Sequence, residues 1–66
     1  MKFPARIESD PAVMMGKPCV KGTRIPVYLL VEKMAAGETS EQLLAAYPQI
    51  TIEDLRACLE YAAAKA

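Results

Sequence analysis

A chain of 66 residues with two cysteines and no histidine has too few ligands for a structural zinc site, which takes four Cys or His side chains. Eight basic residues balance eight acidic ones, and this zero net charge argues against a protein that coats nucleic acid without specificity. No run approaches the roughly 18 apolar residues that span a membrane, and the first ten residues lack the apolar core of a secretory signal. We therefore expect a cytoplasmic protein with no membrane partner.

The small size of the chain also limits its core. A domain of this length buries only about 60% of the surface that its unfolded chain exposes. Domains below roughly 70 residues usually need disulfides, a metal or association with another chain. We expect buried thiols at Cys19 and Cys58 rather than a disulfide. Hydrophobic residues make up 53% of the chain, so by elimination we expect a homodimer or higher homo-oligomer.

Charge is distributed unevenly along the sequence. Residues 1–27 carry five basic and two acidic side chains, a net charge of +3, whereas residues 28–66 carry three basic and six acidic ones, a net charge of −3. One interpretation is chance among sixteen charges. The other is a basic N-terminal β arm, residues 1–27, attached to an acidic helical body, residues 28–66, within a single domain.

In chain order, the first predicted elements are strands. Residues 6–9 alternate polar and apolar side chains and indicate a short strand. A tight β-hairpin is predicted next, with residues 18–20 as one strand, a turn at Lys21-Gly22, and residues 24–27 as the return strand. Turn or strand-end roles across the whole chain are assigned to Gly16, Pro18, Gly22, Thr23, Pro26, Gly37 and Pro48.

From Val27 onward the hydrophobic period is helical. The first helix ends at Gly37, and a capping box from Thr39 to Gln42 begins a second helix that Pro48 ends. Thr51 is expected to cap a third helix. The residues predicted to form its buried stripe are Ile52, Leu55, Cys58, Leu59 and Ala62. The predicted fold is mainly α: a three-helix, helix-turn-helix-like (homeodomain-like) bundle with a short N-terminal β-hairpin.

A recognition helix should present side chains that bind DNA, and the third helix does so poorly. Its exposed early positions are predicted to be Glu53, Asp54 and Arg56, and two carboxylates repel phosphate. The basic arm is the better candidate for a DNA contact. The residues assigned to partner or nucleic-acid binding are Lys17, Lys21, Arg24 and Arg56. For Arg24 the alternative is an ion pair with Glu32 or Glu38, and Tyr47 and Tyr61 are expected to be core or interface aromatics.

Several short motifs carry a family resemblance: Gly16-Lys17-Pro18, Lys21 to Val27, Ala36-Gly37-Glu38, Tyr47-Pro48, and Arg56-Ala57 with Tyr61-Ala62. From about Ile7 to Ala62 the sequence resembles the bacterial and archaeal family known as domain of unknown function 433 (DUF433). The resemblance implies a helix-turn-helix-like fold with an N-terminal β element, often dimeric. It also implies an antitoxin-like role of the VapB type, with a PIN-like nuclease as the toxin. Cys19 stands where the family usually has Val or Ile, which supports a buried thiol.

An enzyme is not expected. The chain has no histidine and no serine or cysteine nucleophile with an adjacent base, and we expect no cofactor. The first hypothesis is an antitoxin-like interaction protein that docks a toxic nuclease and dimerises to bind its own operator DNA. The alternatives are a DNA-binding transcriptional regulator without a toxin partner and a homo-oligomeric structural module.

Overall fold

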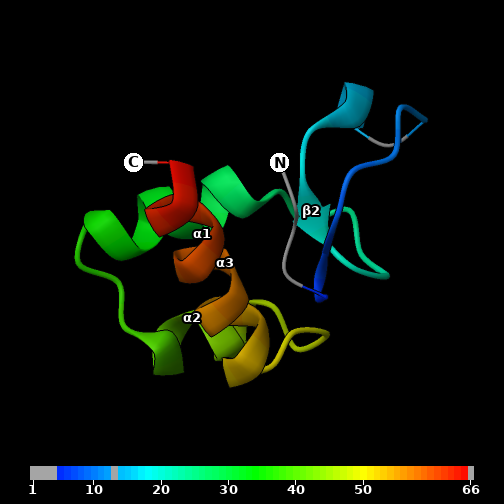
Figure 1. Cartoon of the computed structure of the whole chain (residues 1–66). Coiled ribbons are helices and arrows are strands. Elements are labelled where there is room, and N and C mark those ends of the chain that lie inside the picture. Colours follow the sequence, from blue (N-terminus) through cyan, green and yellow to red (C-terminus); the bar gives the residue numbers. More distant parts are fainter. Residues whose placement is uncertain (1–4, 13, 66) are drawn as a thin grey trace.

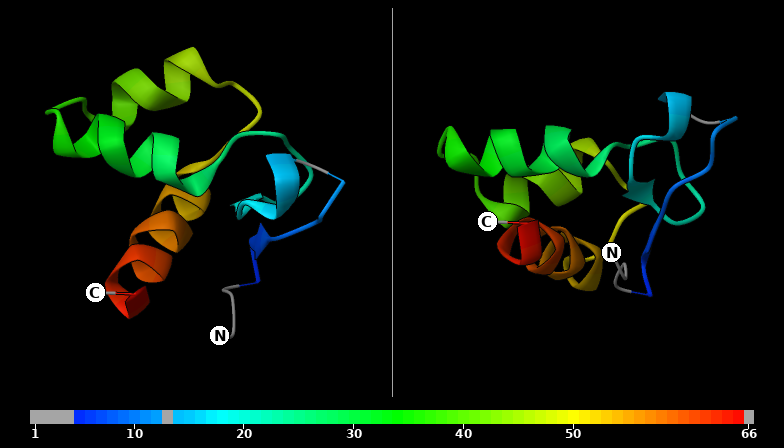
Figure 2. Two further views of the ribbon diagram at one scale, coloured as in Figure 1. Left: turned by 90° about the horizontal axis from the view of Figure 1, so that it is seen from above. Right: turned by 45° about the horizontal axis from the view of Figure 1, so that its top comes forward.

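The structure is a computed structural model that describes residues 5–12 and 14–65 (Figure 1). It is mainly helical, with a short two-stranded antiparallel sheet, as the sequence predicted. The elements in chain order are β1 (Ile7–Glu8), the 3-10 turn η1 (Met14–Gly16), β2 (Cys19–Val20), α1 (Val27–Ala35), α2 (Ser40–Ala46) and α3 (Ile52–Lys65). Figure 2 shows that α1 and α3 cross each other. It also shows that the part of the chain that carries β1 and β2, which we call the β segment, lies beside the start of α1.

The strand pairing differs from the predicted hairpin. β1 pairs antiparallel with β2, so that Ile7 lies opposite Val20 and Glu8 lies opposite Cys19. The return segment after the turn forms only an isolated bridge between Cys19 and Pro26. Pro26 has no N–H to donate to a ladder, and α1 begins at the next residue, so the return strand cannot extend. The predicted strand at residues 6–9 therefore takes the place of this return strand as the partner of β2.

The turn between β2 and α1 is closed by hydrogen bonds around Thr23. Its hydroxyl donates to the Val20 carbonyl at 2.8 Å and accepts from the Ile25 amide at 3.0 Å. The Val20 amide in turn donates to the Ile25 carbonyl at 3.0 Å. Gly22 has a φ of +80°, a left-handed conformation that side chains with a Cβ rarely adopt. The predicted turn at this glycine is thus confirmed.

The ends of α1 and α2 follow their local sequence signals. At Gly37, with φ +102°, the amide donates to the Met34 carbonyl, while the Glu38 amide donates to the Lys33 carbonyl. This is the hydrogen-bond pattern of a Schellman motif, which satisfies the last carbonyls of a helix. The predicted capping box of α2 is also present: Thr39 accepts from the Gln42 amide at 3.1 Å, and the Gln42 side chain accepts from the Thr39 amide at 2.8 Å.

A second reciprocal cap begins α3. The Thr51 hydroxyl accepts from the Asp54 amide at 3.3 Å, and the Asp54 carboxylate accepts from the Thr51 amide at 2.9 Å. The same carboxylate forms an ion pair with Arg6, whose Nη1 lies 3.3 Å from Oδ1. Asp54 is only 7% exposed. The prediction that Asp54 is an exposed position of α3 is therefore wrong, because the cap and Arg6 hold it against the β segment.

One core unites the β segment and the three helices. Its buried members are Ile7, Val20, Ile25, Val27, Leu30, Leu43, Ile50, Leu55, Ala57 and Cys58. Leu55 and Cys58 lie in it as predicted, but Ile52 and Leu59 are 41% and 49% exposed. Those two predictions are wrong. The face of α3 through Asp54, Ala57 and Cys58 is packed against the rest of the molecule, and Ile52 and Leu59 lie to one side of that face.

Replacing Asp54 with alanine should lower the free energy of unfolding by about 1–3 kcal/mol, because it removes the carboxylate that accepts from the Thr51 amide and leaves the Arg6 guanidinium without its partner, while the Thr51 hydroxyl can still accept from the amide of residue 54. Urea unfolding followed by circular dichroism measures this loss. The matched control is Glu53→Ala, an exposed residue of the same helical turn, which should cost no more than about 0.5 kcal/mol. Equal losses for the two variants would contradict this account of the α3 cap.

Candidate functional site

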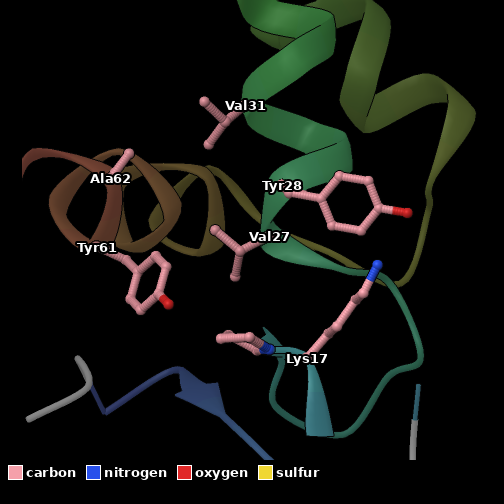
Figure 3. A pocket seen from close by; sticks show the side chains of 7 residues that line it. Lys17, Val27, Tyr28, Val31, Tyr61 and Ala62 are labelled. Atoms are coloured by element: carbon pink, nitrogen blue, oxygen red, sulfur yellow. The ribbon is translucent and has the colours of Figure 1, made fainter. Parts of the chain in front are cut away.

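An open groove lies where α1, the later part of α3 and the segment before β2 meet (Figure 3). Its volume is about 490 Å³. The lining side chains are mainly apolar or aromatic, with a single charged group among them. They are Val27, Tyr28 and Val31 of α1, Tyr61 and Ala62 of α3, and Lys17 and Pro18 of the connecting segment. We call this feature the α1–α3 groove.

The α1 wall is fixed at its start by the backbone. The Val27 amide, which a helix of its own cannot satisfy, donates to the Pro18 carbonyl at 3.0 Å. Val27 is buried and Val31, one turn later, is partly buried against the core. Tyr28, between them in sequence, is 48% exposed and carries its ring along the outer edge of the groove (Figure 3).

Lys17 reaches the groove because the chain reverses just before it. Met15 and Gly16 both have left-handed φ angles, +57° and +83°, and the Ser9 hydroxyl donates a hydrogen bond to the Gly16 carbonyl. The Lys17 ammonium then lies over the ring of Tyr28, with Nζ 4.8 Å from the ring centroid (Figure 3). Among the residues that the structure describes, no carboxylate forms an ion pair with Lys17.

The α3 wall extends the apolar surface beyond the groove. Tyr61 is partly buried against the core, and Ala62 follows it on the groove side. Leu59 lies three residues before Ala62, so the two are surface neighbours on the helix. Because Leu59 is 49% exposed, the apolar surface continues past the groove along α3.

The other basic candidates lie elsewhere. Lys21 and Arg24 are exposed on the turn that follows β2. Within residues 5–12 and 14–65, Arg24 forms no ion pair, and Glu38 pairs instead with Lys33 at 3.5 Å. The alternative prediction, an ion pair from Arg24 to Glu32 or Glu38, is therefore wrong.

Arg56 lines a second, smaller hollow of about 310 Å³. The charged residues around it are two arginines, Arg6 and Arg56, and two glutamates, Glu53 and Glu60. Opposite charges balance there, so the hollow has no excess of either sign. The four basic candidates are thus divided among the groove, the turn between β2 and α1, and this second hollow rather than brought together in one site.

The two candidate aromatics also separate. Tyr61 lines the groove, whereas Tyr47 follows the last turn of α2 and packs against the core. Sequence analysis missed Tyr28 as a groove residue. The sequence does carry a sign of this role: the core stripe of α1 runs through Val27 and Leu30, and Tyr28 is a large aromatic side chain outside that stripe.

The two cysteines are free and buried, which confirms the predicted thiols. Burial raises the pKa of Cys58 to about 11, and the negative charge of Asp54 adds to the effect. Burial, followed by the charge of Glu8, also raises the pKa of Cys19. The thiolate is the reactive form of cysteine, so both side chains are poor nucleophiles at neutral pH. Within the described part of the chain, no group of three or more His, Cys, Asp or Glu is placed to hold a metal ion.

The fold defines a small, mainly helical domain with a two-stranded antiparallel sheet beside three helices. None of the helices described is both long and apolar enough to cross a membrane. The chain belongs to the family described as "Protein of unknown function (DUF433)", whose model matches residues 7–62. This is the family that the sequence motifs resemble.

Two known proteins resemble the chain along most of its length. The uncharacterized protein y4eO of Sinorhizobium fredii is 40% identical over 58 residues, which cover 88% of this chain and 26% of that protein. The crystal structure of a DUF433 member protein from Anabaena variabilis matches with a TM-score of 0.81 and 41% identity. That match covers 85% of this chain and 55% of the other. The chain therefore spans about a quarter and about half of the length of these two relatives.

The stability of the native protein should depend on Cys58 at high pH. The unfolded chain releases the thiol proton near its ordinary pKa of 9.0, whereas the native protein holds it until about 11. Between these values the unfolded state binds fewer protons, so the contribution of Cys58 to stability is complete below pH 9 and is lost as the pH rises toward 11.

Urea unfolding of the wild type and of Cys58→Ala, compared at a series of pH values from 8 to about 10.5, measures this effect. The difference in unfolding free energy between the two proteins should shrink as the pH rises. All other ionisable groups are common to both proteins, so their effects cancel in the difference. A constant difference would show that the Cys58 pKa is not raised.

Proposed function

We propose that this protein is a non-catalytic, antitoxin-like interaction protein that binds a PIN-like nuclease through the α1–α3 groove. The observation that carries the proposal is the groove itself, an apolar hollow edged by a half-exposed tyrosine, Tyr28, and extended by the half-exposed Leu59. Contiguous exposed apolar surface marks interaction sites in proteins, and buried tyrosines are frequent anchors of protein interfaces.

The charge distribution supports a nuclease as the partner. Residues 28–66 carry a net charge of −3. A nuclease that binds RNA presents basic surface around its active site, and an acidic helical body is electrostatically complementary to it. Bound there, the body of this chain would exclude RNA without taking part in any chemistry.

A second proposal is that a homodimer of the protein binds operator DNA, with α2, the turn at residues 47–51 and α3 as a helix-turn-helix-like unit. Lys21 and Arg24 favour it, because both are exposed and neither forms an ion pair within the described residues. The first turn of α3 offers DNA mainly the carboxylate of Glu53, since Asp54 is buried. We therefore assign the phosphate contacts to the turn between β2 and α1. A regulator that binds DNA without a toxin is the alternative.

The nuclease proposal is tested by co-expression with the product of the neighbouring gene, followed by size-exclusion chromatography with light scattering. We expect a stable heterocomplex that persists at high salt, because the proposed interface is mainly apolar, and loss of RNA cleavage by the bound nuclease. The matched control is the same protein co-expressed with an unrelated nuclease. A homo-oligomer that does not bind the product of the neighbouring gene would overturn the proposal.

The DNA proposal predicts a specific effect of the basic residues in the turn between β2 and α1. Lys21→Glu combined with Arg24→Glu should weaken binding to the DNA upstream of the gene and lower the slope of binding against salt by about 2. Fluorescence anisotropy over a range of salt concentrations measures both quantities. The double variant Lys17→Glu with Arg56→Glu changes the net charge equally but elsewhere, and it should have the smaller effect. Equal effects of the two double variants would contradict phosphate contacts by the turn between β2 and α1.

A further inference from the structure

We infer that the α1–α3 groove takes an acidic peptide segment that carries an apolar anchor. A branched aliphatic or aromatic side chain of the segment enters between α1 and α3, and a carboxylate beside it pairs with Lys17. This inference rests on the proposed function, because it specifies which part of a partner protein occupies the groove.

The walls of the groove favour an apolar anchor. Val27, Val31 and Ala62 present only hydrocarbon to the space between the helices, and Tyr61 adds a ring (Figure 3). The volume of about 490 Å³ falls within the roughly 300–1,000 Å³ of sites that bind compact ligands. A side chain that enters it removes apolar surface of both partners from water.

The rim of the groove favours a neighbouring carboxylate. The Lys17 ammonium rests on the face of Tyr28, 4.8 Å from the ring centroid, and pairs with no carboxylate of the described chain. The ring covers one side of the ammonium and leaves its other N–H groups free to donate. A carboxylate that arrives there forms a charge-assisted hydrogen bond without displacing Lys17 from the ring.

The same features argue against other occupants. Nucleic acid requires several cations along its backbone, whereas the groove carries one cation above an apolar floor. A second copy of this chain has an apolar side chain next to a carboxylate at Leu59 and Glu60. However, Glu60 lines the second hollow rather than the groove.

The test uses the full chain and a fluorescein-labelled peptide, Gly-Glu-Leu-Glu-Phe-Glu-Gly, followed by fluorescence anisotropy. We expect saturable binding. It should be lost when lysines replace the glutamates of the peptide, and also when serines replace its leucine and phenylalanine. Lys17→Glu and Tyr28→Ser should each weaken binding about tenfold or more. Lys21→Glu makes the same charge change outside the groove and should leave binding unchanged. Circular dichroism checks that each variant folds.

Several results would overturn the inference. They are absence of binding by the wild type, equal binding of the lysine or serine peptides, and equal loss in Lys17→Glu and Lys21→Glu.

A homodimer that Tyr28→Ser dissociates, together with no peptide binding, would assign the groove to a second copy. If the nuclease complex forms and Lys17→Glu leaves it intact, the inference fails and the proposed function stands. If the peptide binds and no nuclease complex forms, the proposed function fails instead.

Discussion

The arrangement of the rest of the molecule depends on the hydrogen bond and the ion pair that the Asp54 carboxylate forms. This carboxylate accepts from the Thr51 amide to begin α3, and it pairs with Arg6, 48 residues earlier in the sequence. A single side chain therefore sets both where α3 starts and which of its faces meets the β segment. Because a charge this deeply buried is costly without partners, the two contacts are needed together.

The orientation of α3 then decides which surface the molecule presents. With Asp54, Ala57 and Cys58 turned inward, Tyr61 and Ala62 continue that side of the helix and meet α1 at the groove. The groove is closed at its other end by the connection from Pro18 to Val27, where one backbone hydrogen bond joins the segment before β2 to the first turn of α1. The groove thus arises from the packing of three separate parts of the chain, and none of them forms it alone.

The difference between local contacts and contacts among separate parts of the chain explains which features the sequence predicts well and which it does not. Caps and turns at Gly22, Gly37, Thr39 and Thr51 depend on side chains within a few residues, and the local pattern is enough to identify them. The strand partner of β2 and the burial of α3 depend on contacts between distant segments.

The errors have the same origin. Ile52 and Leu59 have the correct helical spacing for a buried stripe, but spacing alone does not say which of two adjacent helix faces meets a neighbour. Tyr28 was missed for the same reason, since its role depends on Lys17 approaching from a reversed turn. The motif residues around Lys17 were recognised from sequence, but their geometry required the left-handed conformation of both Met15 and Gly16.

The separation of the basic residues has a functional consequence. Lys17 is exposed as well, but it lies over an aromatic ring beside apolar surface, an environment suited to a carboxylate that arrives next to an apolar side chain. Lys21 and Arg24 lie exposed on a turn, where their charges are hydrated and screened by salt, an environment suited to phosphates that are bound and released with their counterions. Under the two proposals, one surface provides specificity for a protein partner and the other provides salt-dependent attraction to DNA. A chain of this size can present both without either competing for the same side chains.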